Sequence, residues 1–251
     1  MRLQEKHLDL SGFIHLSNTS GKDFDQATLT LIAGEVHRLP APPVLEKGRG
    51  PEAFMALAPS ATPVQQPLAE YHRYDLPGRY TLKDHEDLQV RLFPDRRVPA
   101  EERYVYRQGN EVMWHLRFVN AEDPMPAGRV RVYQVADRHE IFVGEDWIGH
   151  VPKGDTVDLS LGKAFDLRAR ETVEASKRVG PGVWERTVAI TFRNFKDQTV
   201  RIQVIRSLPE GFELIQASEK PSRKTARTLE FWITVPAHSQ KVLRYTVQTR
   251  S

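Results

Sequence analysis

The sequence predicts an all-β protein made of two β-sandwich domains, the C-terminal one immunoglobulin-like. The clearest observation is a period of two in residues 228–235, where four apolar residues alternate with Thr228, Glu230, Trp232 and Thr234: Leu229, Phe231, Ile233 and Val235. The alternation recurs at Val188, Ile190 and Phe192, at Val200, Ile202 and Val204, and at Leu243, Tyr245 and Val247. Turn residues separate these runs, and short two-faced strands bury their apolar sides by stacking as two sheets.

Two strands are expected at the N-terminus, over residues 3–17 and 27–36. The residues between them are Asn18, Thr19, Ser20, Gly21, Lys22 and Asp23, and these types suit tight turns. We therefore expect the two strands to pair with each other.

A proline-rich stretch follows, from Leu39 to Pro67, with prolines at positions 40, 42, 43, 51, 59, 63 and 67. Proline has no N–H to donate to a strand ladder. We expect this stretch to be a long extended loop inserted in the first domain, with one short helical turn near Glu52 to Leu57.

Strand patterns resume after the loop: Ala69–Asp75, Tyr80–Leu82, Asp87–Phe93, Arg103–Tyr106, Val112–Phe118, Arg129–Tyr133, Glu140–Val143 and Thr156–Leu161. Turns are expected between them, at Leu76-Pro77-Gly78, Gln108-Gly109-Asn110, Asp123 to Gly128 and Pro152 to Asp155. Residues 165–178 suit a strand or a helix, and we predict a long strand that links the domains, which we place at residues 1–164 and 165–251.

A short pattern occurs three times: HLSN at 15–18, RFVN at 117–120 and TFRN at 191–194. Each ends an apolar strand with asparagine, before a turn and another strand. Asparagine ends strands readily because it tolerates the left-handed conformation and bonds to nearby backbone. Two interpretations stay open, convergent turn chemistry and a repeated immunoglobulin-like unit.

The composition excludes several classes of protein. The 251 residues are 39% hydrophobic, and no run approaches the roughly 20 apolar residues that span a bilayer. The first residues, MRLQEKHLDL, have no apolar segment typical of a secretory signal. There is no cysteine, so disulfides, thiolate nucleophiles and cysteine-ligated zinc are excluded.

Positive charge is concentrated in the second predicted domain. Residues 165–251 hold 16 Lys and Arg against 9 Asp and Glu, and the chain has 25 Arg against 11 Lys. Such an excess can mark a polyanion-binding face, but the same charges also suit the solvated face of a sheet. Since no recognition helix or regular aromatic spacing accompanies them, nucleic acid is not the expected partner.

No catalytic motif is present. The chain lacks G-x-S-x-G, G-x-x-x-x-G-K-[ST] and H-E-x-x-H, the signatures of a hydrolase elbow, a phosphate loop and a zinc-protease helix. No two of the nine histidines are spaced two, three or four residues apart. We therefore predict no catalytic or cofactor-binding residues and no cofactor.

The densest polar cluster is the run Asp84, His85, Glu86 and Asp87, which follows Lys83. Its oxygen ligands are a candidate Ca²⁺ site. The alternative is a solvated hairpin turn between Leu82 and Leu88, because the run lacks the glycine and the spaced acceptors of a dedicated loop.

Trp147 is the candidate binding residue. It follows Gly144, Glu145 and Asp146 and precedes Gly149 and His150, in a stretch rich in turn residues. An exposed indole there could stack on a sugar or on a side chain of a partner.

Several segments resemble the bacterial family called domain of unknown function 4139, with its mucoidy inhibitor A-like relatives: PMPAGRVRVYQ (124–134), IFVGEDWIGHVPKGDTVDLSLGKAFDL (141–167), RNFKDQTVRIQV (193–204) and VPAHSQKVLRYTV (235–247). The N-terminal segments 9–36 and 71–93 resemble those that precede this domain. The resemblance implies a β-rich fold and an envelope or extracytoplasmic location, and it assigns no site residues. Members usually begin with a signal and a longer, often coiled-coil region, so this chain is expected to be a trimmed or short version.

These observations predict a non-enzymatic binding or scaffolding module that contacts a protein or glycan partner at the cell envelope. The alternatives are an enzyme whose site is built from loops at the domain junction, and a polyanion-binding protein that uses the basic C-terminal domain.

Overall fold

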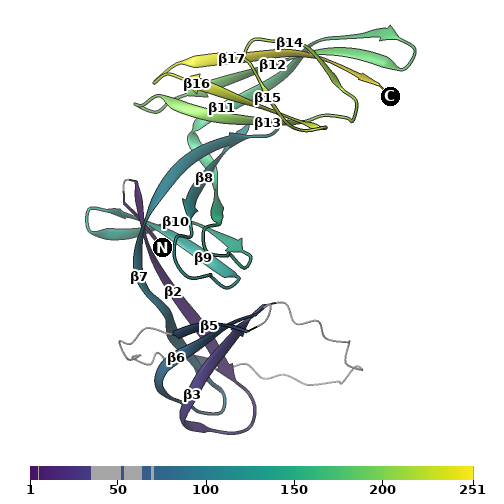
Figure 1. Ribbon diagram of the computed structural model, residues 1–251. Coiled ribbons are helices and arrows are strands. Elements are labelled where there is room, and N and C mark those ends of the chain that lie inside the picture. The colour runs from purple at the N-terminus through teal and green to yellow at the C-terminus, as the bar shows by residue number, and fades with distance from the viewer. Residues whose placement is uncertain (5, 35–51, 54–63, 69–70, 251) are drawn as a thin grey trace. The chain divides into compact units, whose positions relative to one another are not determined.

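The computed structural model describes residues 1–4, 6–34, 52–53, 64–68 and 71–250. Every secondary-structure element in these residues is a β-strand (Figure 1), so the predicted all-β class is confirmed. The strands are β1 (Arg2–Gln4), β2 (His7–Asn18), β3 (Phe24–Ala33), β4 (Glu52–Ala53), β5 (Val64–Leu68), β6 (Tyr71–Leu82), β7 (Glu86–Tyr106), β8 (Glu111–Val119), β9 (Gly128–Ala136), β10 (His139–Ile148), β11 (Thr156–Gly180), β12 (Val183–Asn194), β13 (Val200–Ser207), β14 (Glu213–Ala217), β15 (Ser222–Thr225), β16 (Thr228–Val235) and β17 (Gln240–Arg250).

The contacts divide the chain into two units. Unit 1 comprises Met1–Ala100 and Phe118–Val157, and unit 2 comprises Glu101–Arg117 and Asp158–Ser251. The last boundary along the chain, between Val157 and Asp158, lies seven residues before the domain boundary predicted at residue 165. Residues 101–117 join unit 2, where β13 pairs with the last residues of β7.

Two facing layers meet in unit 1. β2 pairs with β7 in one layer, whereas β3, β6 and β5 pair in the other. The apolar side chains between the layers are Leu76, Tyr80, Leu82, Leu88 and Val90, with Ile14, Leu16 and Leu29 packed against them. The predicted pairing of strands 3–17 and 27–36 is therefore wrong, because the turn at 18–23 carries the chain from one layer to the other.

The described residues of the proline-rich stretch lie in strands rather than in the predicted loop. Residues 39–51 and 54–63 lie outside the described residues, as does most of the predicted helical turn. Glu52–Ala53 is strand and pairs with Glu86 and Asp87 of β7, and Val64–Leu68 pairs with β6. Pro67 lies in β5, for which β6 is the one strand neighbour among the described residues, so its missing N–H can face the other side.

The predicted turn at Leu76-Pro77-Gly78 lies inside β6 instead. Leu76 pairs with Leu29 while Tyr80 pairs with Ala27, so the extra residues form a bulge. Gly78 has φ +95°, a left-handed conformation that suits glycine.

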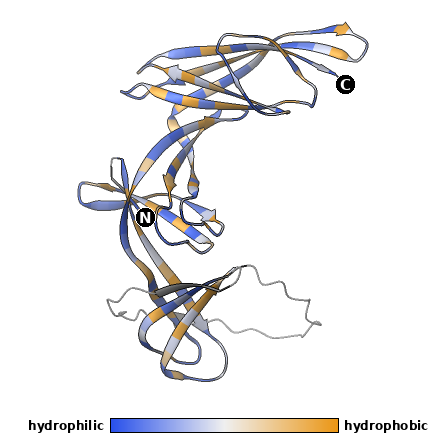
Figure 2. Cartoon of the chain, in the orientation of Figure 1, coloured by the Kyte–Doolittle hydropathy of each residue, from blue (hydrophilic) through white to orange (hydrophobic). Residues whose placement is uncertain are grey.

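Residues 165–178 lie within β11, which confirms the predicted strand over the helical alternative. Unit 2 is a two-layer sandwich in which β12 pairs with β17 and β13 pairs with β16. Its core contains Ile190, Phe192, Ile202, Ile233 and Leu243, all 0% exposed. Apolar and polar bands alternate along these strands in Figure 2, as the period of two predicts. Whether this sandwich is immunoglobulin-like stays a prediction.

The three repeated asparagines have equivalent surroundings. Asn18, Asn120 and Asn194 are buried, and each donates from Nδ2 to one carbonyl oxygen in its own turn and to two in a second turn, over 2.7–3.3 Å. The acceptors are Lys22, Leu82 and Lys83 for Asn18; Asp123, Val151 and Pro152 for Asn120; and Gln198, Val235 and Pro236 for Asn194. The second turn always contains a residue of positive φ three positions after its first acceptor: His85 (60°), Gly154 (84°) and His238 (49°).

The strands around these asparagines repeat as well. We call each set of four strands a module: module 1 is β2, β3, β6 and β7; module 2 is β8, β9, β10 and β11; module 3 is β12, β13, β16 and β17. In each module the first strand neighbours the last, and the two middle strands pair with each other. Shared contacts across both turns favour the repeated unit over convergent turn chemistry.

Candidate binding groove

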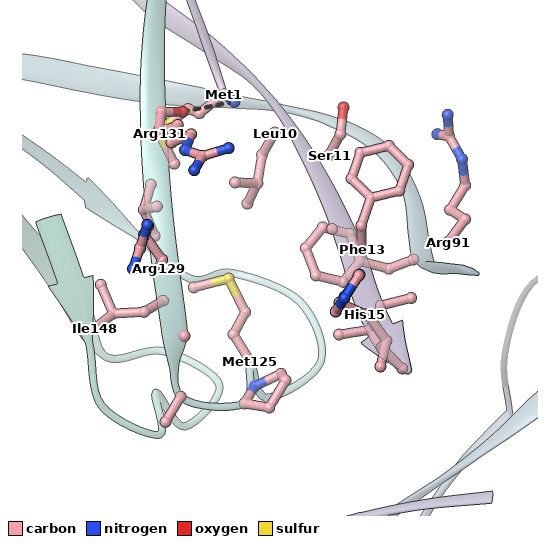
Figure 3. A pocket seen from close by; sticks show the side chains of 18 of the residues that line it. Met1, Leu10, Ser11, Phe13, His15, Arg91, Met125, Arg129, Arg131 and Ile148 are labelled. Carbon is pink, nitrogen blue, oxygen red and sulfur yellow. Dashed lines mark hydrogen bonds between the residues drawn. The ribbon is translucent and has the colours of Figure 1, made fainter. Parts of the chain in front are cut away.

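A groove of about 1310 Å³ is hollowed into unit 1 (Figure 3). Its two walls are β2 and β9, with further side chains from β3, β7 and β10 and from the loop that contains Met125. In Figure 3 the strands of the two walls diverge away from Met1, and Met125 lies between them.

The groove lies beside β1, between β2 and β9. β1 lies between β9 and β2 in the sheet, where Arg2 pairs with both Asp9 and Tyr133. Past Met1, the described structure places no strand against the facing edges of β2 at Leu10–His15 and of β9 at Gly128–Val130. The sheet therefore opens at this point into two unpaired edges.

Gly12 lets the wall of β2 pack closely. A Cβ at this position would overlap the ring of Phe93, which is buried in β7. Glycine is needed here for close approach rather than for an unusual φ.

Large apolar side chains remain exposed in the groove. Phe13, Ile32 and Trp147 are 51%, 53% and 66% exposed and come from three different strands. Leu10 and Met125 also line it but are buried. Exposed apolar groups that gather around one hollow are typical of an interaction site.

The charged lining is mainly basic, with Arg2, Arg91, Arg129 and Arg131 against Asp95 and Glu140. Arg2 bonds to Glu140 and Arg91 to Asp95, both at 2.7 Å, and Arg131 reaches Glu145 at 3.3 Å. Arg129 has no ion-pair partner within the described part of the chain. The groove thus presents a surplus of positive charge.

The two carboxylates that line the groove are both paired with arginines. Asp95 accepts a hydrogen bond from Ser11 Oγ at 2.6 Å, which together with Arg91 lowers the pKa of Asp95 below its ordinary value. Glu140 is held by Arg2. Each of the two carboxylates thus forms an ion pair with an arginine that also lines the groove.

The predicted calcium candidates form a hydrogen-bonded turn. Asp84 Oδ1 accepts from Gly21 N at 2.8 Å, Asp84 Oδ2 contacts His85 Nδ1 at 2.8 Å, and Glu86 Oε2 accepts from Lys83 N at 2.7 Å. Asp87 instead approaches His15 at 3.6 Å. Over the residues that the structure describes, no three His, Asp or Glu side chains converge as metal ligands would.

Trp147, the predicted binding residue, does line the groove, but from strand β10 rather than from a turn. It lies opposite Arg129 of β9. Sequence reasoning missed Phe13, Ile32 and Arg129. The period of two indicated which side chains share a face, but it carries no information on which strand edges stay unpaired.

Unit 2 contains two polar networks. In one, Arg206 binds Glu171 through both terminal nitrogens and donates to Tyr245 Oη at 2.9 Å, while burial raises the pKa of Tyr245. In the other, the buried side chains of Gln203 and Glu230 are joined at 2.6 Å, and Arg103 donates to Gln203. Their strong internal bonds support a structural role.

Comparisons with known proteins add no assignment: no family model, curated protein or solved structure matches this chain. The likeness to the domain of unknown function 4139 family therefore stays a prediction. Within the described strands and turns there is no helix long and apolar enough to cross a membrane.

Proposed function

We propose that this protein is a non-enzymatic binding module that holds a protein partner in the groove of unit 1. The observation that carries the proposal is the exposure of Phe13, Ile32 and Trp147 around one hollow. Covering such side chains is favourable by about 25 cal/mol for each Å² of apolar surface removed from water. Lining arginines would add orientation and selectivity.

The test is capture of partners from the native organism on immobilised full-length protein. Trp147→Ala removes the most exposed aromatic side chain of the groove, and we expect loss of the captured partner. Because Trp147 is largely exposed, the free energy of unfolding should change by less than about 0.5 kcal/mol. The matched control is Trp184→Ala in β12, a partly exposed indole outside the groove. Equal capture by both variants and by the unaltered protein would refute the proposal.

We also propose that the module acts at the bacterial cell envelope. This location is supported by the family resemblance of residues 124–134 and 141–167. Fractionation of native cells with an antibody to this protein tests it, and recovery in the cytosolic fraction alone would contradict it.

A further inference from the structure

Three arginines of unit 2 lie on the outer face of the sheet that contains β11 and β12. Leu167 of β11 and Phe192 of β12 are both 0% exposed and belong to the core. Since side chains alternate between the two faces of a strand, Arg168, Arg170 and Arg193 point away from that core, and all three are exposed.

The three arginines are close neighbours. Arg168 pairs with Arg193 across β11 and β12, and Arg170, two residues along the same face, pairs with Thr191. Side chains that face each other across two strands have Cβ atoms about 4.5–5.5 Å apart, and like charges in this position are destabilising. A bound anion would offset this repulsion.

No carboxylate within the described residues forms an ion pair with these arginines. The acidic side chains of this part of β11 contact other cations: Asp166 with Lys196, Glu171 with Arg206 and Glu174 with Arg244. The guanidinium of Arg168 donates instead to two uncharged carbonyl oxygens, of Phe165 at 2.7 Å and of Leu167 at 3.3 Å. The face therefore carries positive charge that is available to a ligand.

Two exposed phenylalanines border the arginines. Phe165 is 81% exposed, and its ring lies 5.7 Å from the guanidinium of Arg168. Phe195 is 46% exposed, and its ring lies 4.8 Å from the guanidinium of Arg193. The N–H of Phe195 donates to the C=O of Asp166 at 2.9 Å, which holds the two segments together.

These side chains form one surface, which we call the basic aromatic patch: Phe165, Arg168, Arg170, Arg193 and Phe195. Guanidinium groups bind phosphate oxygens through paired N–H donors, which any phosphate-bearing polyanion could satisfy. Exposed phenyl rings gain free energy only where they leave water. An anionic lipid surface meets both requirements, because phosphate head groups lie directly above an apolar layer of acyl chains.

We propose that the basic aromatic patch binds the surface of a membrane that contains anionic phospholipids. The rings of Phe165 and Phe195 enter the boundary between head groups and acyl chains, and the three arginines contact the phosphates. This binding is peripheral. It uses no residue of the groove in unit 1 and does not depend on the function proposed for that groove.

The experiment is sedimentation of the full chain with vesicles made of equal parts phosphatidylglycerol and phosphatidylcholine, compared with vesicles of phosphatidylcholine alone. We expect binding to the anionic vesicles and little to the neutral ones. Replacing Arg168 and Arg193 together by glutamine should weaken binding by about twentyfold, at about fivefold for each arginine removed. Arg227→Gln, at an exposed turn outside the patch, is the control and should bind as the unaltered protein does.

A second set of variants tests the rings. Phe165→Ala should weaken binding to the anionic vesicles by about tenfold or more, because the apolar ring no longer enters the membrane. Phe24→Ala is the matched control, since Phe24 is 45% exposed but lies on β3, outside the patch. Thermal unfolding of each variant checks that the fold is intact.

The proposal requires both sets of substitutions to weaken binding to the anionic vesicles. It is wrong if either set leaves this binding unchanged, or if neutral vesicles bind equally well. Heparin serves as a soluble polyanion, and retention on heparin without binding to vesicles would assign the arginines to a soluble ligand and overturn the lipid proposal. Capture of partners through Trp147 is measured separately, so either proposal can fail while the other stands.

Discussion

At the scale of single residues, three buried asparagines each join two turns of a module. Asn194, with 1% of its surface exposed, donates to Gln198, Val235 and Pro236. A single amide thus satisfies carbonyl groups that the turns leave without ladder partners. Because this geometry occurs three times, asparagine recurs at the end of a strand in the sequence, at Asn18, Asn120 and Asn194.

We predict that Asn194→Ala lowers the free energy of unfolding by about 2–4 kcal/mol, because three carbonyl groups, one in a buried hydrogen bond and two in partly buried ones, lose a donor. Urea unfolding followed by tryptophan fluorescence measures it. Asn110→Ala, at an exposed turn whose side chain carries no such bonds, is the control. A change of less than about 0.5 kcal/mol for Asn194→Ala would contradict the structural role.

The Glu230 carboxyl should make the stability of the fold depend on pH in the acid range. Burial alone would raise its pKa, but hydrogen bonds from Gln203, Lys224 and Trp232 outweigh burial and hold the pKa below the ordinary 4.5. A carboxyl with a lowered folded-state pKa stabilises the fold above pH 4.5, and this contribution is lost as the pH falls through the folded value.

Acid unfolding between pH 5 and pH 2 tests this contribution, compared for the unaltered chain and Glu230→Gln, with the exposed Glu210→Gln as control. The loss of stability with falling pH should be shallower in Glu230→Gln alone. An identical pH dependence in all three proteins would show that Glu230 contributes nothing.

At the scale of elements, alternation predicted the strands well but not their partners. The alternation in residues 228–235 correctly predicted strand β16 and its buried face, because a period of two depends only on neighbouring residues. The pairing of β2 with β7 and of β3 with β6 depends on contacts between distant segments. A turn was predicted at Leu76-Pro77-Gly78, where the structure has a bulge in β6. Proline and glycine suit both features, so only the pairing of β6 with β3 distinguishes them.

The close packing of β2 on β7 gives a test at this scale. Gly12→Ala places a Cβ in the ring of Phe93, and we expect a loss of about 1–3 kcal/mol in unfolding free energy. Gly128→Ala, on the opposite wall, meets open space and should be nearly neutral. Denaturant unfolding compares them, and a second substitution, Phe93→Leu, should recover part of the loss. Equal stability of Gly12→Ala and Gly128→Ala would rule out the contact.

At the scale of the whole molecule, three modules of one topology produce an edge that is covered in one unit and open in the other. Module 3 receives a parallel strand from β7, whereas β1 covers only part of the equivalent edge in module 2. Trp147 was predicted as a binding residue from the turn-rich stretch around it, which includes Gly144, Gly149 and His150. The rest of the groove could not be predicted, because its lining comes from strands that lie far apart in the sequence.

The most direct test of the open edge is amide hydrogen exchange in the free, full-length protein, resolved by residue with nuclear magnetic resonance. The N–H groups of Arg129 and Arg131 should exchange rapidly, because no strand in the described part of the chain pairs with this edge of β9 at these residues. Those of Ile202, Gln203 and Val204, which lie between β16 and β7, should exchange slowly. Slow exchange at Arg129 and Arg131, matching that of β13, would contradict the open strand position.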